Sequence, residues 1–599
     1  MNSKNTAEKE NATSMATRIR EISISEFFAK NRHLLGFDNP LKAVLTAVRE
    51  GVDNSLDACE EAGILPDITV QIEAESETHF RVSIEDNGPG ILKSHLPNIF
   101  AKLLYGSKFH RLKQSRGQQG IGISAAVMYG QMTTGKPAEV VSKTGAGKTA
   151  HRIQLQIDTK KNAPKVVSDT EARDAAWQNK ISGTRISITM EGAYKEGRHG
   201  VLAYLSQTAL SNPHANISLL DPKGKLHKFP RIVEELPKAP KEIQPHPHGI
   251  ELGSLIQMMQ DVKKEGVAPF LKREFSRVTD NVAVEICKTA HLSPKQITAS
   301  LNRKEATALY NAIQQTKLLP PPTNCLSPME EASLLKALHW LFVESQKWDG
   351  EELSSREEES VPVPQKGQAE FSFASEPVKE KPQLQAQTDE EGSLLSSQGD
   401  YFVTAVTRPP AVYRGNPFQV EVGLFYGKGL KADGLMQVYR YANRVPLQYQ
   451  ASACAMSKAA MSAPWKSYGL EQSKGALPTG PVVIMMHIAS VWVPYTSESK
   501  EAIAHYPEII KELRLALLEC GRRLERFLKH RRRAADEAKK RSYIEKYLNP
   551  IGEALQEILG LSATQKASTI EELKVILEKS REKILPEKGA KRHVFEETE

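Results

Sequence analysis

The chain has 599 residues, enough for roughly three or four domains, and 40% apolar with 25% charged residues is an average soluble composition. Its five cysteines are scattered without a CxxC pair and its histidines do not cluster at ligand spacing, so neither a disulfide framework nor a zinc site is predicted. A polar N-terminus and the lack of any long apolar run argue against secretion and membrane spanning, and favour the cytoplasm. The net charge of +8 permits nucleic-acid binding but is small for this length.

The first 230 residues show helix and strand patterns in turn. Apolar residues recur with helical period over 41–59, which predicts an amphipathic helix. Segments 67–74 and 80–86 alternate like half-buried strands and are expected to pair as a hairpin. Similar strand patterns follow at 151–158 and 183–190. This part of the chain therefore predicts a layer of helices on one mixed or antiparallel sheet.

The remaining sequence divides into a helical part, a low-complexity part and a mixed part. A Pro- and His-containing linker at 236–249 precedes short helical patterns over 250–315, which predict a small helical module. Residues 346–398 are rich in Glu, Ser, Gln and Pro, and predict a disordered insertion. Strand patterns resume at residue 400, and a long helical pattern with a basic stretch begins at Pro507.

A carboxylate and a carboxamide lie one turn apart on the helix over 41–59. Glu50, Asn54 and Asp57 are spaced i, i+4 and i+7, and so share one helix face. Such a pair is suited to activating a water beside Mg²⁺, which prefers hard oxygen ligands. Taken alone the pattern is weak, because an ordinary solvated helix face has the same spacing.

Two glycine motifs follow the helix. In "EDNGPG", Asp86 ends a strand ahead of Gly88 and Gly90, which allow the backbone to approach a ligand, although a simple turn has the same pattern. In "SRGQQGIGISAAVMYG", Gly117, Gly120 and Gly122 surround the start of a helical stretch, whose N-terminus can bind an anion. No βαβ strand precedes this second motif, which argues against a dinucleotide-binding fold.

In this order, within about seventy residues, the three motifs resemble the Bergerat ATP-binding fold of the GHKL superfamily. The resemblance implies that Glu50 polarises the attacking water, Asn54 binds Mg²⁺ and Asp86 accepts a hydrogen bond from adenine. Thr184, in "SGTRISI", is expected near Asp86. The phosphates of ATP are expected against a lid made of Gly117, Gln118, Gln119, Gly120, Ile121, Gly122, Ile123 and Ser124.

Longer strings resemble the B subunits of DNA topoisomerase VI over roughly residues 20–530: "LLYGSKFHRLKQSRGQQGIG", "TAVTRPPAVYRGNPFQVEVGLFYG", "YRYANRVPLQY" and "VPYTSESKEAIA". The resemblance implies an α+β multidomain protein. Its expected parts are an N-terminal strap (1–28), a Bergerat (GHKL) ATPase α/β sandwich (29–230), a linker and helix-two-turn-helix module (231–318), a ribosomal-S5-like α/β transducer (319–530) and a charged helical extension (531–599). Some members of the family end in an immunoglobulin-like domain, whereas the sequence of 531–599 is charged, has a helical pattern and shows no run of alternating strands.

The same resemblance implies a site that receives a residue from the transducer. Lys500, in "TSESKEAIA", is expected to reach the γ-phosphate, and Ser107 and Lys108, in "YGSK", are expected near the nucleotide. With ATP and Mg²⁺ bound, two copies are expected to close into a dimer around double-stranded DNA. No acidic cluster follows the transducer, so DNA cleavage is assigned to a separate A subunit in an A2B2 heterotetramer, associated with the nucleoid if the source is prokaryotic.

Two features of the sequence have two interpretations each: the function of the whole chain and the role of its basic strings. The alternative to a topoisomerase component is an ATP-switched clamp or chaperone-like protein of the same superfamily. The basic strings "KHRRR" and "AKKR" either contact DNA phosphates or form a solvated helix face.

"SKTGAGKTAH" resembles a P-loop but has Ser142 where the first glycine is needed, and a strand pattern follows it. It is predicted to be a hairpin turn with Lys148 exposed.

Overall fold

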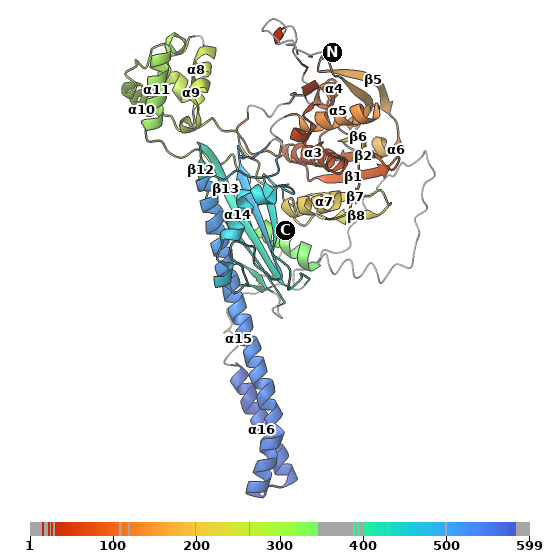
Figure 1. Ribbon diagram of the computed structural model, residues 1–599, viewed down its shortest axis with the longest axis vertical. Coiled ribbons are helices and arrows are strands. Elements are labelled where there is room, and N and C mark those ends of the chain that lie inside the picture. Colours follow the sequence, from red (N-terminus) through yellow and green to blue (C-terminus); the bar gives the residue numbers. More distant parts are fainter. Residues whose placement is uncertain are drawn as a thin grey trace, which may run out of the picture.

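The computed structural model describes residues 30–106, 111–117, 120–197, 199–262, 264–344, 387–389, 392–395, 400–427, 429–497 and 500–582, and the short pieces 15–16, 22–23 and 26–27. The part expected to bind ATP, residues 30–229, is called the ATPase part; it lies beside a second sheet, from which a long helical hairpin projects (Figure 1). Across these described ranges, none of the helices is long and apolar enough to cross a membrane.

The ATPase part is an eight-stranded sheet in the order β5-β4-β3-β6-β2-β1-β7-β8, with only β1 and β7 parallel among its pairs. Its strands are β1 (Asp67–Ala74), β2 (His79–Asp86), β3 (Ala138–Lys143), β4 (Ala150–Asp158), β5 (Ala163–Ala172), β6 (Gly183–Glu191), β7 (Asn216–Leu220) and β8 (Leu226–Phe229). Its helices are η1 (Arg32–Leu35), α3 (Pro40–Glu61), α4 (Leu96–Ala101), α5 (Gly122–Thr134), α6 (Ala175–Asn179) and α7 (Val201–Ser211). The predicted mixed sheet with a helical layer is confirmed.

Helix α3 begins and packs as its sequence predicts. Asn39 caps it by accepting a hydrogen bond from the backbone of Lys42, and Pro40 occupies the first turn, where no intrahelical donor is needed. Its apolar stripe, including Val48 and Val52, is fully buried against the sheet. The opposite edge of the helix is left to carry the polar residues of the candidate site.

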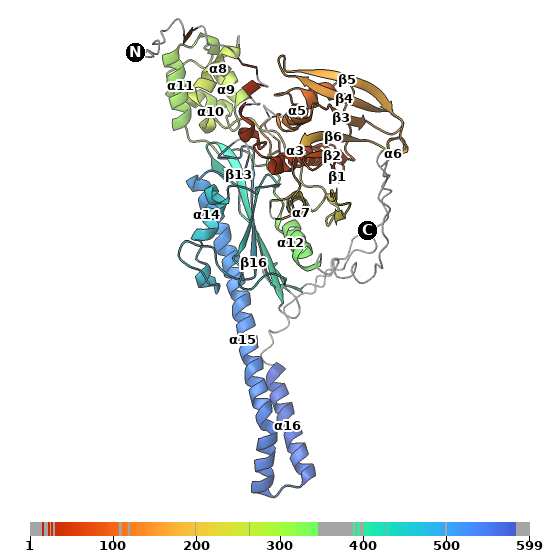
Figure 2. The same ribbon diagram turned by 45° about the vertical axis from the view of Figure 1, so that its right-hand side comes forward.

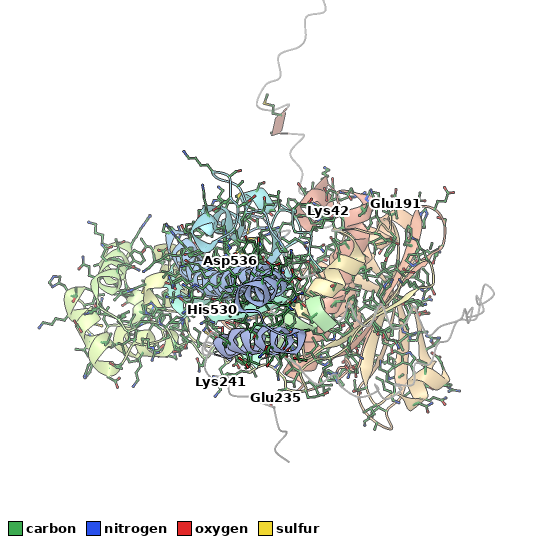
Figure 3. All side chains as sticks on the ribbon, turned by 90° about the horizontal axis from the view of Figure 1, so that it is seen from below. Lys42, Glu191, Glu235, Lys241, His530 and Asp536 are labelled. Carbon is green, nitrogen blue, oxygen red and sulfur yellow. The ribbon has the colours of Figure 1, made fainter. Side chains whose placement is uncertain are left out.

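The helical module has a core of its own. It contains η2 (Pro247–Gly249), α8 (Leu252–Asp261), α9 (Val267–Glu274), α10 (Asp280–Thr289), η3 (Thr298–Ser300) and α11 (Arg303–Gln315). A capping box between Asn302 and Glu305 starts α11. Seen along α15, this module and the ATPase part lie on opposite sides of the molecule (Figure 3).

The second sheet has the order β15-β14-β16-β13-β11-β10-β9, with β12 paired to β13. Its strands are β9 (Gln387–Thr388), β10 (Leu394–Leu395), β11 (Tyr401–Thr407), β12 (Ala411–Tyr413), β13 (Asn416–Gly427), β14 (Gln437–Ala442), β15 (Val445–Pro446) and β16 (Val482–Ser490). One face packs on α12 (Glu331–His339) and η4 (Trp340–Glu344). The other packs on α14 (Ala455–Ser462), which the short η5 (Ala451–Ala453) precedes, on η6 (Trp465–Tyr468) and on α15 (Pro507–Leu559). Leu424 and Phe425 of β13 face opposite cores, as strand periodicity requires.

Most of the insertion expected at 346–398, including all of 346–386, lies outside the described residues. Two short stretches of its last part, 387–389 and 392–395, are described and contain strands, which differs from the expectation of disorder across 346–398. Strands β9 and β10 pair with each other, and β10 pairs with β11. Leu394 is buried in the core under α12, so burial of an apolar side chain explains the order.

Helix α15 continues without a break through residue 530, where the extension was expected to begin. Leu528 is the last of its side chains in the core of the second sheet. Beyond it the helix leaves the sheet, ends at Gly560 in left-handed conformation and is followed by the returning helix α16 (Ala563–Glu582) (Figure 2). His530 and Asp536 lie on the departing part of α15 (Figure 3). Residues 583–599 lie outside the described residues.

Candidate nucleotide site

Glu50 lies against the first turn of α5. A Cβ atom added at Gly122 would be 1.7 Å from Glu50 Oε2, so only glycine leaves room for the carboxylate there. Among the described residues, no side chain caps the N-terminus of α5, whose first N–H groups and positive dipole end favour negative charge. Arg49 donates to Glu50 Oε1 at 3.3 Å. The carboxylate is therefore fixed beside a set of backbone donors, which suits a base placed next to phosphates.

Asn54 lies one turn beyond Glu50 and is exposed. A Cβ at Gly117 would be 3.9 Å from Asn54 Oδ1, so the carboxamide faces the start of the glycine loop. An exposed amide oxygen at this position fits Mg²⁺, which keeps several waters and takes few protein ligands. Within the described ranges, no group of three His, Cys, Asp or Glu side chains is placed to hold a metal ion.

Asp86 is buried at the end of β2 and accepts three hydrogen bonds. The backbone N–H groups of Gly88 and Thr184 donate to Oδ1 at 2.9 and 3.1 Å, and Ser55 Oγ donates to Oδ2 at 3.0 Å. Burial raises the pKa of Asp86, and these bonds oppose the rise. A carboxylate has about four acceptor sites, so Oδ2 retains one for a further donor.

Thr184 is placed beside Asp86, and it contacts Ser142, which stands out in the sequence only as the misfit in the false P-loop motif. Ser142 Oγ lies 3.1 Å from Thr184 Oγ1 and accepts from the Ile91 N–H at 2.8 Å. Gly90 has a φ of 72°, and a Cβ there would lie 2.0 Å from the carbonyl of Lys143. The "EDNGPG" turn thus needs glycine for contact with β3.

The glycine loop is described in two pieces. Gly117 ends the first piece. Gly120, with a φ of 58°, begins the second, which continues through Ile121 into α5. Ile123 and Ser124 are buried in the first turn of that helix. The remaining expected members, Gln118 and Gln119, lie outside the described residues, as do Ser107 and Lys108.

The P-loop look-alike is the turn between β3 and β4. Gly147 has a φ of 71°, and Lys148 is exposed. Replacing Lys148 with alanine should leave the affinity for ATP within about twofold of wild type, because a solvated lysine of this kind contributes little. Titration with a fluorescent ATP analogue measures this, and a large loss of affinity would place the nucleotide in this turn instead.

Lys500 comes from the second sheet's domain but lies beside the glycine loop. Its Nζ is 3.4 Å from the carbonyl of Arg116, and its φ is 53°. The next residue, Glu501, is buried and pairs with Lys42 of α3 at 3.1 Å. This ion pair fixes the lysine-bearing loop onto the helix that carries Glu50.

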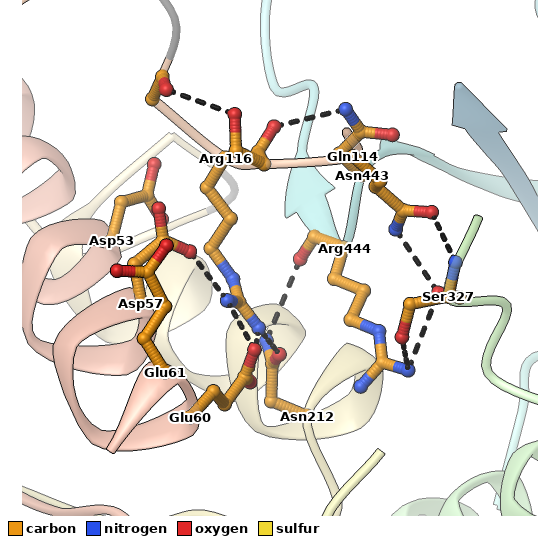
Figure 4. A network of polar contacts seen from close by, with 12 residues as sticks. Asp53, Asp57, Glu60, Glu61, Gln114, Arg116, Asn212, Ser327, Asn443 and Arg444 are labelled. Atoms are coloured by element: carbon orange, nitrogen blue, oxygen red, sulfur yellow. Dashed lines mark hydrogen bonds and ion pairs between the residues drawn. The ribbon is translucent and has the colours of Figure 1, made fainter. Parts of the chain in front are cut away.

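Arg116, which the sequence interpretation passed over, is the most connected side chain near the loop. It is 5% exposed and donates to Asp57 at 2.8 Å, to Glu60 at 2.6 Å and to Asn212 at 2.5 Å (Figure 4). Burial opposes ionisation of Glu60, but Arg116 and His214 hold its pKa well below its usual range. The position of this arginine just before the glycine loop could have been noticed in the sequence. Its partners could not, because they come from two helices distant in sequence.

Asp53 adds a titrating group beside Glu50. It accepts from the Tyr204 hydroxyl at 3.2 Å and is buried. Burial and the charge of Glu50 raise its pKa to about 7, against the lowering effect of Arg116 and Lys500. Near neutral pH it therefore carries only part of a charge, which limits repulsion of an anionic ligand.

Comparison with known proteins gives two matching family profiles. Residues 42–185 match the family described as histidine kinase-, DNA gyrase B-, and HSP90-like ATPase. Residues 390–540 match the family described as topoisomerase VI B subunit, transducer. The first range contains Glu50, Asn54, Asp86 and the glycine loop, and the second contains Lys500.

Curated relatives cover most of the chain. The B subunit of type 2 DNA topoisomerase 6 from Archaeoglobus fulgidus is 45% identical over 91% of this chain and 80% of its own length. The proteins of the same name from Methanosarcina barkeri and Pyrococcus horikoshii are 42% and 38% identical, over 92% and 90% of this chain and 79% and 92% of their own lengths. The chain therefore belongs to the family of the B subunits of DNA topoisomerase VI.

Proposed function

We propose that this chain is the ATP-binding and ATP-hydrolysing B subunit of a type IIB DNA topoisomerase. The observation that carries the proposal is the Glu50 carboxylate against the uncapped first turn of α5, with Lys500 of the transducer beside the same loop. ATP-driven closure of two copies captures a DNA segment. This segment passes through a double-strand break made by a separate A subunit, and its passage relaxes supercoiled DNA and separates catenated DNA.

Each residue of the site has a distinct part in ATP turnover. Asp86 accepts a hydrogen bond from the adenine amino group through its remaining acceptor site, and Ser55 and Thr184 hold its orientation. Donors of the glycine loop and the start of α5 bind the phosphates. Glu50 takes a proton from the attacking water. Asn54 holds Mg²⁺, which when bound neutralises phosphate charge and orients the phosphate oxygens.

The second candidate function is an ATP-switched clamp or chaperone-like protein without topoisomerase activity. Such a protein also binds ATP and dimerises, so ATP hydrolysis alone does not separate the two. The transducer match and the relatives' names favour the topoisomerase function. Arrangement as an A2B2 heterotetramer on duplex DNA is part of the proposal.

The deciding experiment is reconstitution of the full chain with its candidate A subunit. Supercoiled and catenated DNA should be relaxed and decatenated only when both subunits, ATP and Mg²⁺ are present. A Glu50→Ala chain with the same A subunit serves as the control. ATP hydrolysis without any strand passage, in the presence of an A subunit that binds the chain, would favour the clamp.

Replacing Lys500 with alanine should weaken ATP-induced dimerisation by about tenfold or more, because a charge-assisted contact to the terminal phosphate is removed. Analytical ultracentrifugation with a non-hydrolysable ATP analogue measures the dimer. Lys474→Ala removes an exposed lysine of the same domain and is the matched control. Dimerisation of the Lys500 variant equal to that of the control would refute the role of this lysine.

A further inference from the structure

The turn between β14 and β15 consists of Asn443 and Arg444, and both have positive φ, 47° and 67°. Two-residue hairpin turns with this geometry favour asparagine first and glycine second. Arginine at the second position is strained, so its side chain must be needed for another reason. The contacts of the turn supply that reason, since both residues are buried where the ATPase part meets the transducer (Figure 4).

Asn443 ties the transducer sheet to the segment that leads into the glycine loop. Its Nδ2 donates to the carbonyl oxygens of Ser115 and Ser490, each at 2.9 Å. Its Oδ1 accepts from the Ser490 N–H at 2.9 Å. Ser115 is two residues before Gly117, so displacement of the loop acts directly on this amide.

Arg444 makes contacts in three directions. Its carbonyl accepts from Ser211 Oγ at the end of α7 at 2.6 Å. Its guanidinium donates to the carbonyl of Pro328 at 2.8 Å. Its N–H donates to His487 Nε2 of β16 at 3.0 Å. One residue thus joins the ATPase part, the segment before α12 and the transducer sheet.

Arg116 completes the link from the ATPase side. Its guanidinium donates to Asn212 Oδ1, and Asn212 Nδ2 lies 3.1 Å from Ser211 Oγ, the group that binds Arg444. The loop therefore reaches the turn by two routes, through the backbone of Ser115 and through the side chain of Arg116. A contact that only holds two domains together would not need both routes to begin in the segment that leads into the glycine loop.

The network continues across the transducer sheet. Because His487 Nε2 accepts a hydrogen bond, the imidazole is neutral and its Nδ1–H donates to Glu421 at 2.8 Å. Glu421 also accepts the N–H groups of Met329 and Glu330, each at 2.8 Å, just before α12. His487 and Glu421 are both fully buried. Polar contacts thus run from the loop to the start of the helix that covers one face of the sheet.

We propose that the Asn443–Arg444 turn is the joint that transmits the position of the glycine loop to the transducer, with Arg116 and Asn212 as positioning residues. This inference rests on the proposed function, because the transmitted signal is the state of the bound nucleotide. Buried polar networks have few alternative arrangements, so a shift at Ser115 or Arg116 must be taken up at β16 and α12.

The test compares Asn443→Gly with Gln450→Gly in the full chain assembled with its A subunit. Glycine suits positive φ, so the hairpin survives while the amide links are lost. Gln450 is an exposed residue of the same domain with a φ of 51° and is the matched control. We expect ATP consumed per strand-passage event to rise at least about fivefold in Asn443→Gly and to stay at the wild-type value in the control. An unchanged ratio, or an equal rise in both variants, overturns the proposal.

A second measurement uses only the wild-type chain. Hydrogen exchange at the amides of Arg444, Met329 and Glu330 should slow by about fivefold or more when a non-hydrolysable ATP analogue and Mg²⁺ are added. Unaltered exchange at all three overturns the coupling role even if a variant fails to fold. Failure of the wild-type assembly to hydrolyse ATP or pass strands refutes the proposed function. Full wild-type activity without these effects refutes only the coupling joint.

Discussion

Replacement of Glu50 by alanine is expected to leave ATP bound but to lower its hydrolysis by about 10²–10⁴-fold, because the base is removed while the phosphate-binding backbone survives. Steady-state phosphate release measures hydrolysis, and retention of labelled nucleotide measures binding. Glu50→Gln should behave alike, since the amide keeps the shape but cannot accept the proton. Glu73→Ala, which removes an exposed carboxylate of β1, should be unaffected. Turnover of the Glu50 variants equal to that control would rule Glu50 out as the base.

Gly122→Ala should lower hydrolysis by about a hundredfold while the protein remains folded. The new Cβ would lie 1.7 Å from Glu50 Oε2, and the flexible glutamate side chain must move away from the site. Gly253→Ala in α8, where a Cβ meets no atom within 4 Å, is the control. Phosphate release gives the rate, and thermal unfolding reports on the fold.

A double substitution separates displacement of the base from general damage to the loop. If Gly122→Ala acts by moving Glu50, adding it to Glu50→Ala should cause little further loss, because the two changes remove the same function. Multiplicative losses in the double variant would mean that Gly122 serves the phosphates independently. Either way the rates of the four proteins decide between the two roles.

The local parts of the candidate site could be predicted from the sequence because each of them lies on a single element. The helical period over 41–59 placed Glu50 and Asn54 on one edge of α3, and glycine spacing located the loop before α5. Strand alternation likewise predicted β1 and β2 as a hairpin. Such patterns are fixed by backbone geometry and need no knowledge of the partner element.

Side-chain contacts between residues far apart in the chain could not be predicted from local sequence patterns. Ser55 has no distinguishing sequence pattern, yet it donates to Asp86, which is 31 residues further along the chain. Asn443 reaches Ser115 across 328 residues, and nothing in either local sequence specifies the pairing. Similarly, low complexity around residue 390 concealed the burial of Leu394, which depends on the neighbouring strand. These contacts follow from packing of whole elements, which a single sequence does not determine.

Helix α15 has a mechanical consequence. It is anchored in the transducer core as far as Leu528 and then continues to Leu559 as one helix, so about 45 Å of it projects beyond the anchor. A tilt of about 5° at the core would carry its far end about 4 Å sideways. Packing of Gly552 against Ile570 joins the returning α16 closely to that end, which stiffens it. By this geometry, any rotation of the sheet would displace the far end of the hairpin more than it displaces the anchored part of α15.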